Sequence, residues 1–421
     1  MDFRPVERAV AASLKAVMSR PEPRTVLVIV TGRDRPGVTA RLFAAMSEHA
    51  VDVVDVEQVV VRGRLILGIL LSASEDEEGF RGTVGKVAGS LGMDVEFAPG
   101  SGDPIRKPGR THVTVLGHPL RPAAMSAVAS RIAARRGNID RIVRLASYPV
   151  TSIELEVSGV DPAVLRVELA GEALSHGFDV AVQPSGLIRR AKRLVVMDVD
   201  STLVQGEVIE MLAERAGVLD QVTKVTAEAM RGELEFAEAL RARVRLLAGL
   251  PATAVDDVRA SVRLTPGART LVRTLKRLDY GFAIVSGGFT QVTDHLAEEL
   301  SLDYAAANTL EIVDGRLTGE LVGPVLDRAG KAAALRRFAA AAGVPLSQTV
   351  AVGDGANDLD MIAAAGLGIA FNAKPVLREA ADTAVNVPYL DAVLYLLGIS
   401  RQEVEAADAA DGYTTPAPPL D

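Results

Sequence analysis

The chain has no cysteine, no tryptophan and only 4% aromatic residues, and these absences exclude several kinds of site. Without cysteine there is no disulfide, no thiolate nucleophile and no thiolate-held metal, which is compatible with a reducing compartment. The histidines lie outside the motifs described below, so a histidine-based mechanism is not expected; they are His49, His112, His118, His176 and His295.

Long apolar runs and an excess of positive charge are also missing. No apolar stretch approaches the ~20 residues of a membrane-spanning helix, and residues 1–23 lack the unbroken apolar core of a cleaved signal peptide. The formal net charge of −8 argues against a general nucleic-acid binder. We therefore expect a cytoplasmic metabolic enzyme without nucleic-acid or membrane partners, in which residues 1–23 form an N-terminal arm.

Length and composition favour several helix-covered sheets. A chain of 421 residues is long enough for about two to four domains, each with its own core. Apolar residues make up 48% of it, and alanine and glycine are abundant. This composition is typical of α/β proteins.

The most informative stretch is residues 194–203, where a short apolar run leads to two aspartates. In an extended chain, residues i and i+2 point to the same side, so Asp198 and Asp200 can reach one reacting centre. In open α/β sheets, ligands bind at the carboxyl ends of the strands. The pair suits a metal-assisted reaction with one nucleophile and one proton carrier, although such a pair alone is more often a turn or a helix cap.

Three further pieces follow downstream. Residues 283–288 end an apolar run with Ser286 and Gly287, which offer a hydroxyl and free backbone N–H groups to an anion. Lys331 begins a helical stretch and would bring a positive charge to a phosphate. Asp354 follows a third apolar run and could complete an oxygen-only magnesium site with Asp198. Each piece alone is a weak signal, but the ordered set is strong.

These pieces, in this order, resemble the haloacid dehalogenase superfamily of phosphotransferases, and most closely its phosphoserine phosphatases. The resemblance covers about residues 192–398. It implies a doubly wound, Rossmann-like α/β core over residues 190–400, with a helical cap at about 207–263. An ATP-driven pump of this superfamily carries threonine where this chain has Asp200, so the aspartate favours rapid hydrolysis.

The resemblance also implies a role for each motif residue. Asp198 would attack phosphorus to form an aspartyl-phosphate, and Asp200 would act as general acid and base. The pKa of Asp200 must then be raised, by burial or by the charge of Asp198. Mg²⁺ would be held by Asp198, Asp354 and the backbone carbonyl of Asp200. The groups implied to neutralise the phosphate or to orient the site are Ser286, Gly287, Lys331, Asn357 and Asp358.

The substrate is inferred from the cap. Glu207 and Arg243 match the family positions for the ammonium and carboxylate of serine, and Met230 and Phe236 match apolar positions of the same pocket. Opposite charges at two ends of a small pocket suit a zwitterion. The alternative is that Glu207 and Arg243 are solvated residues on helix faces.

The implied activity is hydrolysis of O-phospho-L-serine to serine and phosphate, the last step of serine biosynthesis. One alternative is a related phosphatase or phosphotransferase acting on another small phosphate, such as phosphohomoserine. Another is an amino-acid-sensing regulatory protein whose phosphatase half is vestigial. The intact carboxylates and Lys331 count against this last alternative.

The N-terminal part predicts two repeats of a ferredoxin-like βαββαβ unit, over residues 24–100 and 110–185, with a Gly/Pro-rich linker between them. Within the first repeat, residues 65–71 are expected to form a buried strand. The loop at residues 32–37 resembles that of ACT domains, small amino-acid-sensing modules that commonly pair across a dimer. We therefore expect a homodimer that is feedback-regulated by serine.

Two details of these repeats and the end of the chain complete the expectations. Gly37 is either the place where an effector approaches the backbone or a plain turn glycine, and both alternatives stay open. The second repeat has Ala123 at the corresponding position, which suggests that it has lost effector binding. The acidic, proline-rich residues 401–421 are expected to form a flexible tail.

Overall fold

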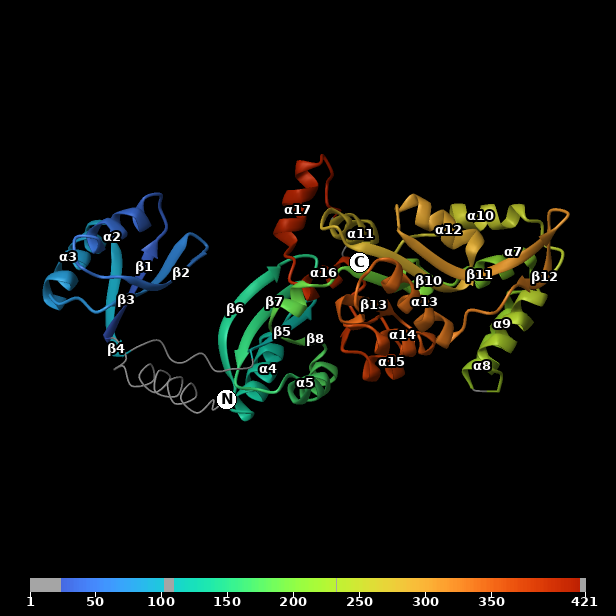
Figure 1. Ribbon diagram of the computed structural model, residues 1–421, viewed down its shortest axis with the longest axis horizontal. Coiled ribbons are helices and arrows are strands. Elements are labelled where there is room, and N and C mark those ends of the chain that lie inside the picture. Colours follow the sequence, from blue (N-terminus) through green and yellow to red (C-terminus); the bar gives the residue numbers. More distant parts are fainter. Residues whose placement is uncertain (1–23, 102–109, 232, 417–421) are drawn as a thin grey trace, which may run out of the picture. The chain divides into compact units, whose positions relative to one another are not determined.

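A computed structural model describes residues 24–101, 110–231 and 233–416, which fall into two compact units (Figure 1). The first unit lies within residues 1–106 and the second within residues 107–421. The N-terminal arm expected over residues 1–23 lies outside the described residues. Among the helices of the described ranges, none is long and apolar enough to cross a membrane.

The first unit contains the first repeat, and its elements follow the expected βαββαβ order. They are β1 (Arg24–Arg33), α2 (Val38–Met46), β2 (Val53–Val61), β3 (Arg64–Ser72), α3 (Glu77–Ser90) and β4 (Met93–Ser101). The antiparallel sheet has the order β2-β3-β1-β4. The strand expected at residues 65–71 is confirmed as β3, but it is not buried on both faces. Leu65 and Leu67 are buried, whereas Ile66 between them is 45% exposed, because both helices pack on one face.

The second repeat has the same order of elements within the second unit. They are β5 (Arg110–Gly117), α4 (Pro122–Ala134), β6 (Asn138–Ala146), β7 (Thr151–Ser158), α5 (Pro162–His176) and β8 (Asp179–Pro184). Its strands have the equivalent order β8-β5-β7-β6. Both helices begin with a proline at the first helical position, where the missing N–H costs no hydrogen bond.

The core of the second unit is a parallel sheet covered on both faces. Its strands, in spatial order, are β11 (Tyr304–Val313), β10 (Gly281–Phe289), β9 (Leu194–Asp198), β13 (Thr349–Gly353), β14 (Gly368–Phe371) and β15 (Thr383–Val385). Val195 and Met197 of β9 pack in one hydrophobic cluster, and Leu194 and Val196 pack in another. Burial of alternate residues on opposite faces is typical of a doubly wound fold. The covering helices are α11 (Ala268–Arg277), α12 (Thr290–Glu299), α13 (Arg328–Ala341), α14 (Leu359–Ala364), α15 (Pro375–Ala380) and α16 (Val393–Leu396).

A helical insert follows β9, as the sequence predicts. Its helices are α7 (Val208–Ala216), α8 (Leu219–Met230), α9 (Phe236–Arg245) and α10 (Thr253–Ser261). A hairpin of β11 and β12 (Arg316–Val322) reaches from the core sheet to this cap, where β12 lies beside α9 (Figure 1). Backbone hydrogen bonds fix the contact: Gly249 N–H donates to Leu317 O at 2.8 Å, and Leu317 N–H donates to Leu250 O at 2.9 Å.

The second repeat and the core share one sheet of eleven strands, a continuity that the sequence does not predict. Strand β15 pairs antiparallel with β8. The Asp179 carboxylate accepts hydrogen bonds from the backbone N–H and the side-chain amide of Asn386, at 2.7 Å and 2.6 Å. The buried Gln183 amide donates to Leu396 O at 2.9 Å. A short helix, α6 (Leu187–Arg190), connects the two parts.

The expectation of a flexible tail after residue 400 is wrong for the described residues. Helix α17 (Arg401–Ala410) begins at a capping box in which the Ser400 hydroxyl accepts the Glu403 N–H and the Glu403 carboxylate accepts the Ser400 N–H. Further along, Asp408 is fully buried and forms ion pairs with Arg273 and Arg277 of α11. These paired charges hold the helix against the core.

Candidate active site

Strand β9 ends at Asp198, and the following turn keeps Asp200 at the same edge of the sheet. Ser201 has a left-handed φ of 56° in this turn. The Asp198 carboxylate accepts the Val199 N–H at 2.8 Å, and the Asp200 carboxylate accepts the Val208 N–H at 2.8 Å. Both aspartates line one cavity. The i, i+2 spacing therefore delivers both carboxylates to one site, as predicted.

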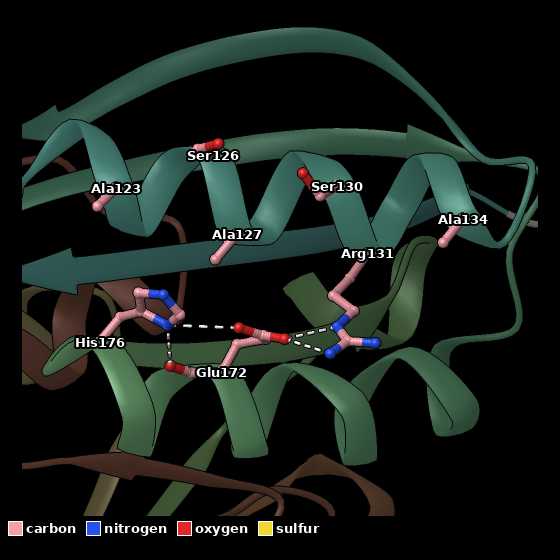
Figure 2. Close-up of a pocket in the computed structure, with 8 residues that line it drawn as sticks. All are labelled: Ala123, Ser126, Ala127, Ser130, Arg131, Ala134, Glu172 and His176. Carbon is pink, nitrogen blue, oxygen red and sulfur yellow. Dashed lines mark hydrogen bonds and ion pairs between the residues drawn. The ribbon is translucent and has the colours of Figure 1, made fainter.

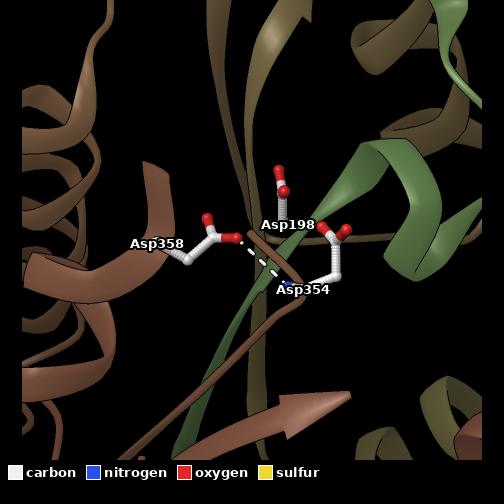
Figure 3. A group of neighbouring side chains, drawn as sticks. All are labelled: Asp198, Asp354 and Asp358. Atoms are coloured by element: carbon white, nitrogen blue, oxygen red, sulfur yellow. Dashed lines mark hydrogen bonds between the residues drawn. The ribbon is translucent and has the colours of Figure 1, made fainter. Parts of the chain in front are cut away.

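Three carboxylates converge beside this strand end (Figure 3). One oxygen from each of Asp198, Asp354 and Asp358 lies within 4.8 Å of the others. Asp198 comes from β9, and the other two follow β13, the adjacent strand. The convergence of Asp198 and Asp354 is confirmed. Asp358, expected only to orient other groups, is itself within reach of a shared ion, whereas the role of the Asp200 carbonyl stays a prediction.

The chemistry of this donor set fits a hard divalent cation. Burial and the charge of Asp358 raise the pKa of Asp198, and the same two causes raise the pKa of Asp354 to about 6. These shifts show that the carboxylates repel one another and are poorly solvated. Mg²⁺ prefers carboxylate oxygens and would relieve that repulsion.

Lys331 places a positive charge among these carboxylates. Its side chain is buried, and Nζ lies 2.7 Å from Asp198 Oδ1 and 2.7 Å from Asp358 Oδ1. It sits in the first turn of α13, where the Asp327 side chain accepts the Gly330 N–H as a cap. Burial alone would lower the pKa of Lys331, but the two carboxylates outweigh it and raise the pKa. The lysine is therefore positively charged beside Asp198.

The last part of β10 contains small residues and lies next to Asp200. The Ser286 hydroxyl donates to Asp200 Oδ2 at 2.9 Å and accepts the Gly288 N–H at 2.7 Å. A Cβ on Gly288 would lie 3.0 Å from the Asp200 carboxylate, and one on Gly287 would lie 3.2 Å from the Phe236 ring. Gly287 thus favours the close approach of the cap, and Gly288 favours the close approach of Asp200 within the core.

The electrostatics of Asp200 suit a proton carrier. Burial raises the pKa of Asp200, and the hydrogen bonds from Val208 and Ser286 oppose that shift. The raised pKa agrees with the sequence prediction. Of the two causes left open there, burial is the leading one, not the charge of Asp198.

A cavity of about 570 Å³ opens between the core and the cap. The predicted site residues that line it are Asp198, Asp200, Glu207, Phe236, Arg243, Gly287, Asp354 and Asn357. Ser286, Lys331 and Asp358 are each 1% exposed or less and form the layer behind the cavity wall. Met230 ends α8, but its side chain lies outside the described part of the structure.

Glu207 and Arg243 face this cavity from the cap, with different environments. Burial and the charge of Asp200 raise the pKa of Glu207 to about 7, while Ser201 donates a hydrogen bond to its carboxylate at 3.0 Å. The Arg243 guanidinium makes long hydrogen bonds, 3.5 Å to Thr226 Oγ1 and 3.4 Å to Ala239 O. The guanidinium is thus held only by long hydrogen bonds within the cavity lining.

The sequence analysis missed several lining residues, among them Thr226 and Lys374. Thr226 lies four residues before Met230 on α8, so the helical spacing places both on one face and could have revealed it. Lys374 follows β14, and its backbone N–H donates to Asp354 O at 3.0 Å. A residue just beyond a parallel strand is at the ligand-binding edge of the sheet, which is the signal that could have identified it.

A second hollow, between α4 and α5, contains none of the predicted site residues (Figure 2). Glu172 accepts a hydrogen bond from Arg131 at 2.6 Å and forms an ion pair with His176 at 3.3 Å. In the first unit, Gly37 has a φ of 89° directly before α2, a conformation that favours glycine. The turn alone explains this glycine, and its role in effector binding stays a prediction.

Comparisons with known proteins agree with this architecture. A haloacid dehalogenase-like hydrolase model matches residues 195–363, and ACT domain models match residues 24–98 and 110–183. The chain is 64% identical over 389 residues to a phosphoserine phosphatase of Streptomyces coelicolor, covering 91% of this chain and 94% of that relative. The chain belongs to the phosphoserine phosphatase family. It is a phosphatase with a haloacid dehalogenase-like core and tandem ACT domains.

Further phosphoserine phosphatases support this assignment. One from Mycobacterium tuberculosis is 54% identical over 397 residues, covering 93% of this chain and 97% of the relative. The unliganded crystal structure of a probable phosphoserine phosphatase from Vibrio cholerae matches with a TM-score of 0.55 at 36% identity, covering 72% of this chain and 90% of that chain. A haloacid dehalogenase family hydrolase from Salmonella enterica serovar Typhi matches with a TM-score of 0.60 at 27% identity, covering 68% of this chain and 98% of that chain.

Proposed function

We propose that this phosphatase hydrolyses O-phospho-L-serine to L-serine and phosphate in a Mg²⁺-dependent reaction. The observation that carries the proposal is a single cavity lined by Asp198 and by the opposite charges of Glu207 and Arg243. A phosphate ester of an amino acid has a phosphate, an ammonium and a carboxylate to match these three groups. The family relationship supports the same substrate.

The proposed mechanism has two displacements at phosphorus. The Asp198 carboxylate attacks the phosphorus atom, the bond from phosphorus to the serine oxygen breaks, and Asp200 gives that oxygen a proton. In the second step a water molecule attacks phosphorus and gives a proton to Asp200. The bond from phosphorus to the Asp198 oxygen breaks, which restores the Asp198 carboxylate and releases inorganic phosphate. Asp200 is thus returned to its acidic form, which its burial favours.

The remaining residues bind and neutralise the phosphate. Ser286, the Gly287 N–H and Lys331 provide donors for its oxygens, an electrostatic task central to phosphoryl transfer. Asn357 lines the same cavity and would orient the phosphate. Asp198, Asp354 and the Asp200 carbonyl would hold Mg²⁺, which would supply further positive charge. Asp358 fixes Lys331 through its ion pair.

The test is steady-state hydrolysis of a panel of phosphorylated amino acids, with and without Mg²⁺. The proposal expects the highest kcat/KM with O-phospho-L-serine and a loss of turnover when the metal is chelated. Preference for phosphohomoserine, the alternative substrate, would contradict the assignment of the cap pocket. Full activity in a chelator would contradict the metal role.

For the ACT domains, we propose that serine is a feedback effector. Serine is the product of the proposed reaction, so its binding would adjust the activity to the amount of product. The support is the family of the two domains and their position ahead of the catalytic core. Serine should then inhibit without competing with phosphoserine, because it would bind outside the catalytic cavity. Purely competitive inhibition would contradict this proposal, since it would place serine in the cavity itself. A cytoplasmic location stays a prediction.

We also propose a homodimer, and β2 supports it. This strand lies at an edge of the first sheet, and its six valines are 44–57% exposed. An exposed apolar edge strand is a ready site for pairing with a second chain. Lysines in place of Val56 and Val60 should give a monomer in analytical ultracentrifugation, and a persistent dimer would contradict pairing through β2.

A further inference from the structure

Asn308, on β11, holds two separate parts of the phosphate-binding region with one buried amide. Its side chain is 3% exposed. The Nδ2 atom donates to Gly287 O at 2.9 Å, and the Oδ1 atom accepts the Leu326 N–H at 2.7 Å. Gly287 belongs to the last part of β10, where the pairing with β11 shifts register, whereas Leu326 lies just before α13. The sequence motifs do not include this residue.

The first contact fixes the peptide between Gly287 and Gly288. Its carbonyl oxygen accepts from Asn308, and its N–H donates to Ser286 Oγ at 2.7 Å. The Ser286 hydroxyl in turn donates to Asp200 at 2.9 Å. Glycine has no side chain that restricts its backbone, so the orientation of this peptide depends on the groups that hold its two ends.

The second contact fixes the start of the helix that carries Lys331. Residue 327, immediately after Leu326, caps α13: Asp327 accepts the Gly330 N–H at 2.8 Å, and its carbonyl accepts the Lys331 N–H at 2.9 Å. Lys331 Nζ then lies 2.7 Å from Asp198. A shift of residues 326–327 would therefore move the lysine relative to the nucleophile.

We propose that Asn308 is a positioning residue that sets the spacing between Lys331 and the Ser286–Gly287 segment of β10. This inference rests on the proposed function, in which these groups bind the phosphate from two sides. Donors that stabilise a phosphoryl group must be held within about 0.5 Å of their productive positions. A buried amide with both ends engaged provides that constraint without touching the substrate.

Two variants separate the contacts. Asn308→Ala removes both hydrogen bonds, whereas Asn308→Asp keeps an acceptor for the Leu326 N–H and loses the donor to Gly287 O. The matched control is Gln291→Ala on α12. The Gln291 amide donates to Leu310 O at 2.8 Å and accepts the Leu310 N–H at 3.3 Å, so it anchors the same strand two residues further on.

The measurement is the affinity for inorganic phosphate by calorimetry in the presence of Mg²⁺. The affinity for serine in the catalytic cavity is taken from the competitive part of its inhibition of p-nitrophenyl phosphate hydrolysis. Removal of one oxyanion-hole donor lowers kcat by about 10²–10³-fold. Loss of the support for such donors should have a smaller effect on the bound phosphate ion, so its affinity should fall by about tenfold in both Asn308 variants. Serine affinity should change by less than about twofold, because its proposed partners, Glu207 and Arg243, lie in the cap. Gln291→Ala should lower the melting temperature and leave phosphate affinity unchanged.

Unchanged phosphate affinity in the folded Asn308 variants would overturn the inference. Equal losses for phosphate and serine would also overturn it, since they would indicate general disruption. Turnover of p-nitrophenyl phosphate keeps this test independent of the substrate. If the wild-type protein hydrolyses that ester but not phosphoserine, the substrate proposal fails while the Asn308 variants still report on the phosphate site.

Discussion

Replacement of Arg243 by alanine should lower kcat/KM only for substrates that carry a carboxylate. The guanidinium lies in the cavity wall, and its hydrogen bonds to Thr226 and Ala239 are long, at 3.5 Å and 3.4 Å. It therefore has donors left for a ligand. Hydrogen bonds to a charged group contribute about 1.5–3 kcal/mol each, so a two-pronged contact should contribute about 3–4 kcal/mol.

The assay compares two substrates that differ in one group. A loss of about 3–4 kcal/mol corresponds to a fall of about 10²–10³-fold in kcat/KM for O-phospho-L-serine. Phosphoethanolamine has the phosphate and the ammonium but no carboxylate, so its kcat/KM should change by less than about threefold. The control is Arg241→Ala, because Arg241 is exposed on the same helix and should affect neither substrate.

Equal losses for the two substrates would refute this reasoning. They would mean that Arg243 acts on the phosphate or on the shape of the cap, not on the carboxylate. Thermal melting of each variant, measured in parallel, separates a binding defect from unfolding.

Further outcomes follow from the same structure. Asp198→Asn should abolish turnover and the phospho-enzyme detected after acid quench; residual phospho-enzyme would contradict its role as nucleophile. Removal of divalent cations should lower the melting temperature, because the clustered carboxylates then repel, and an unchanged value would contradict a shared ion there. Asp408→Ala should cost about 3 kcal/mol of stability, measured by denaturant unfolding, since Arg273 and Arg277 lose their buried partner. Burial alone would raise the pKa of Asp408, but both arginines hold it below its ordinary value, so its contribution is present at neutral pH and lost as the pH falls below about 4. An acid-induced loss equal in wild type and Asp408→Ala would contradict this.

The parts of the site that the sequence predicts are those carried by strand ends. Asp198, Ser286 and Asp354 each follow an apolar run, and parallel strands bring such residues to one edge regardless of loop detail. The prediction that Asp198 and Asp200 point to the same side required only the two-residue period of an extended chain. For Asp358 the sequence predicts only an orienting role, because the pattern of residues after a strand does not show that the chain turns back toward Asp198.

The features that the sequence does not predict depend on contacts between distant segments. Helix α17 reads as polar, but its buried side includes Asp408, whose partners on α11 precede it by more than a hundred residues. Composition alone therefore suggested a flexible tail. The pairing of β15 with β8 is likewise a matter of register between short strands, and no local pattern specifies it.

The order of the core strands explains why motifs so far apart in sequence form one site. Strand β9 lies between β10 and β13, so Asp198 has Ser286 of β10 on one side and the Asp354 loop on the other. Lys331 comes from α13, the helix that leads into β13, and its ion pairs with Asp198 and Asp358 link the two strands. β10 is joined on its other side to β11, which carries Asn308. The groups around Asp198 are thus held by β10, by α13 and by the loop after β13, and a shift of any one of these elements would move a group that contacts the nucleophile or lies beside it.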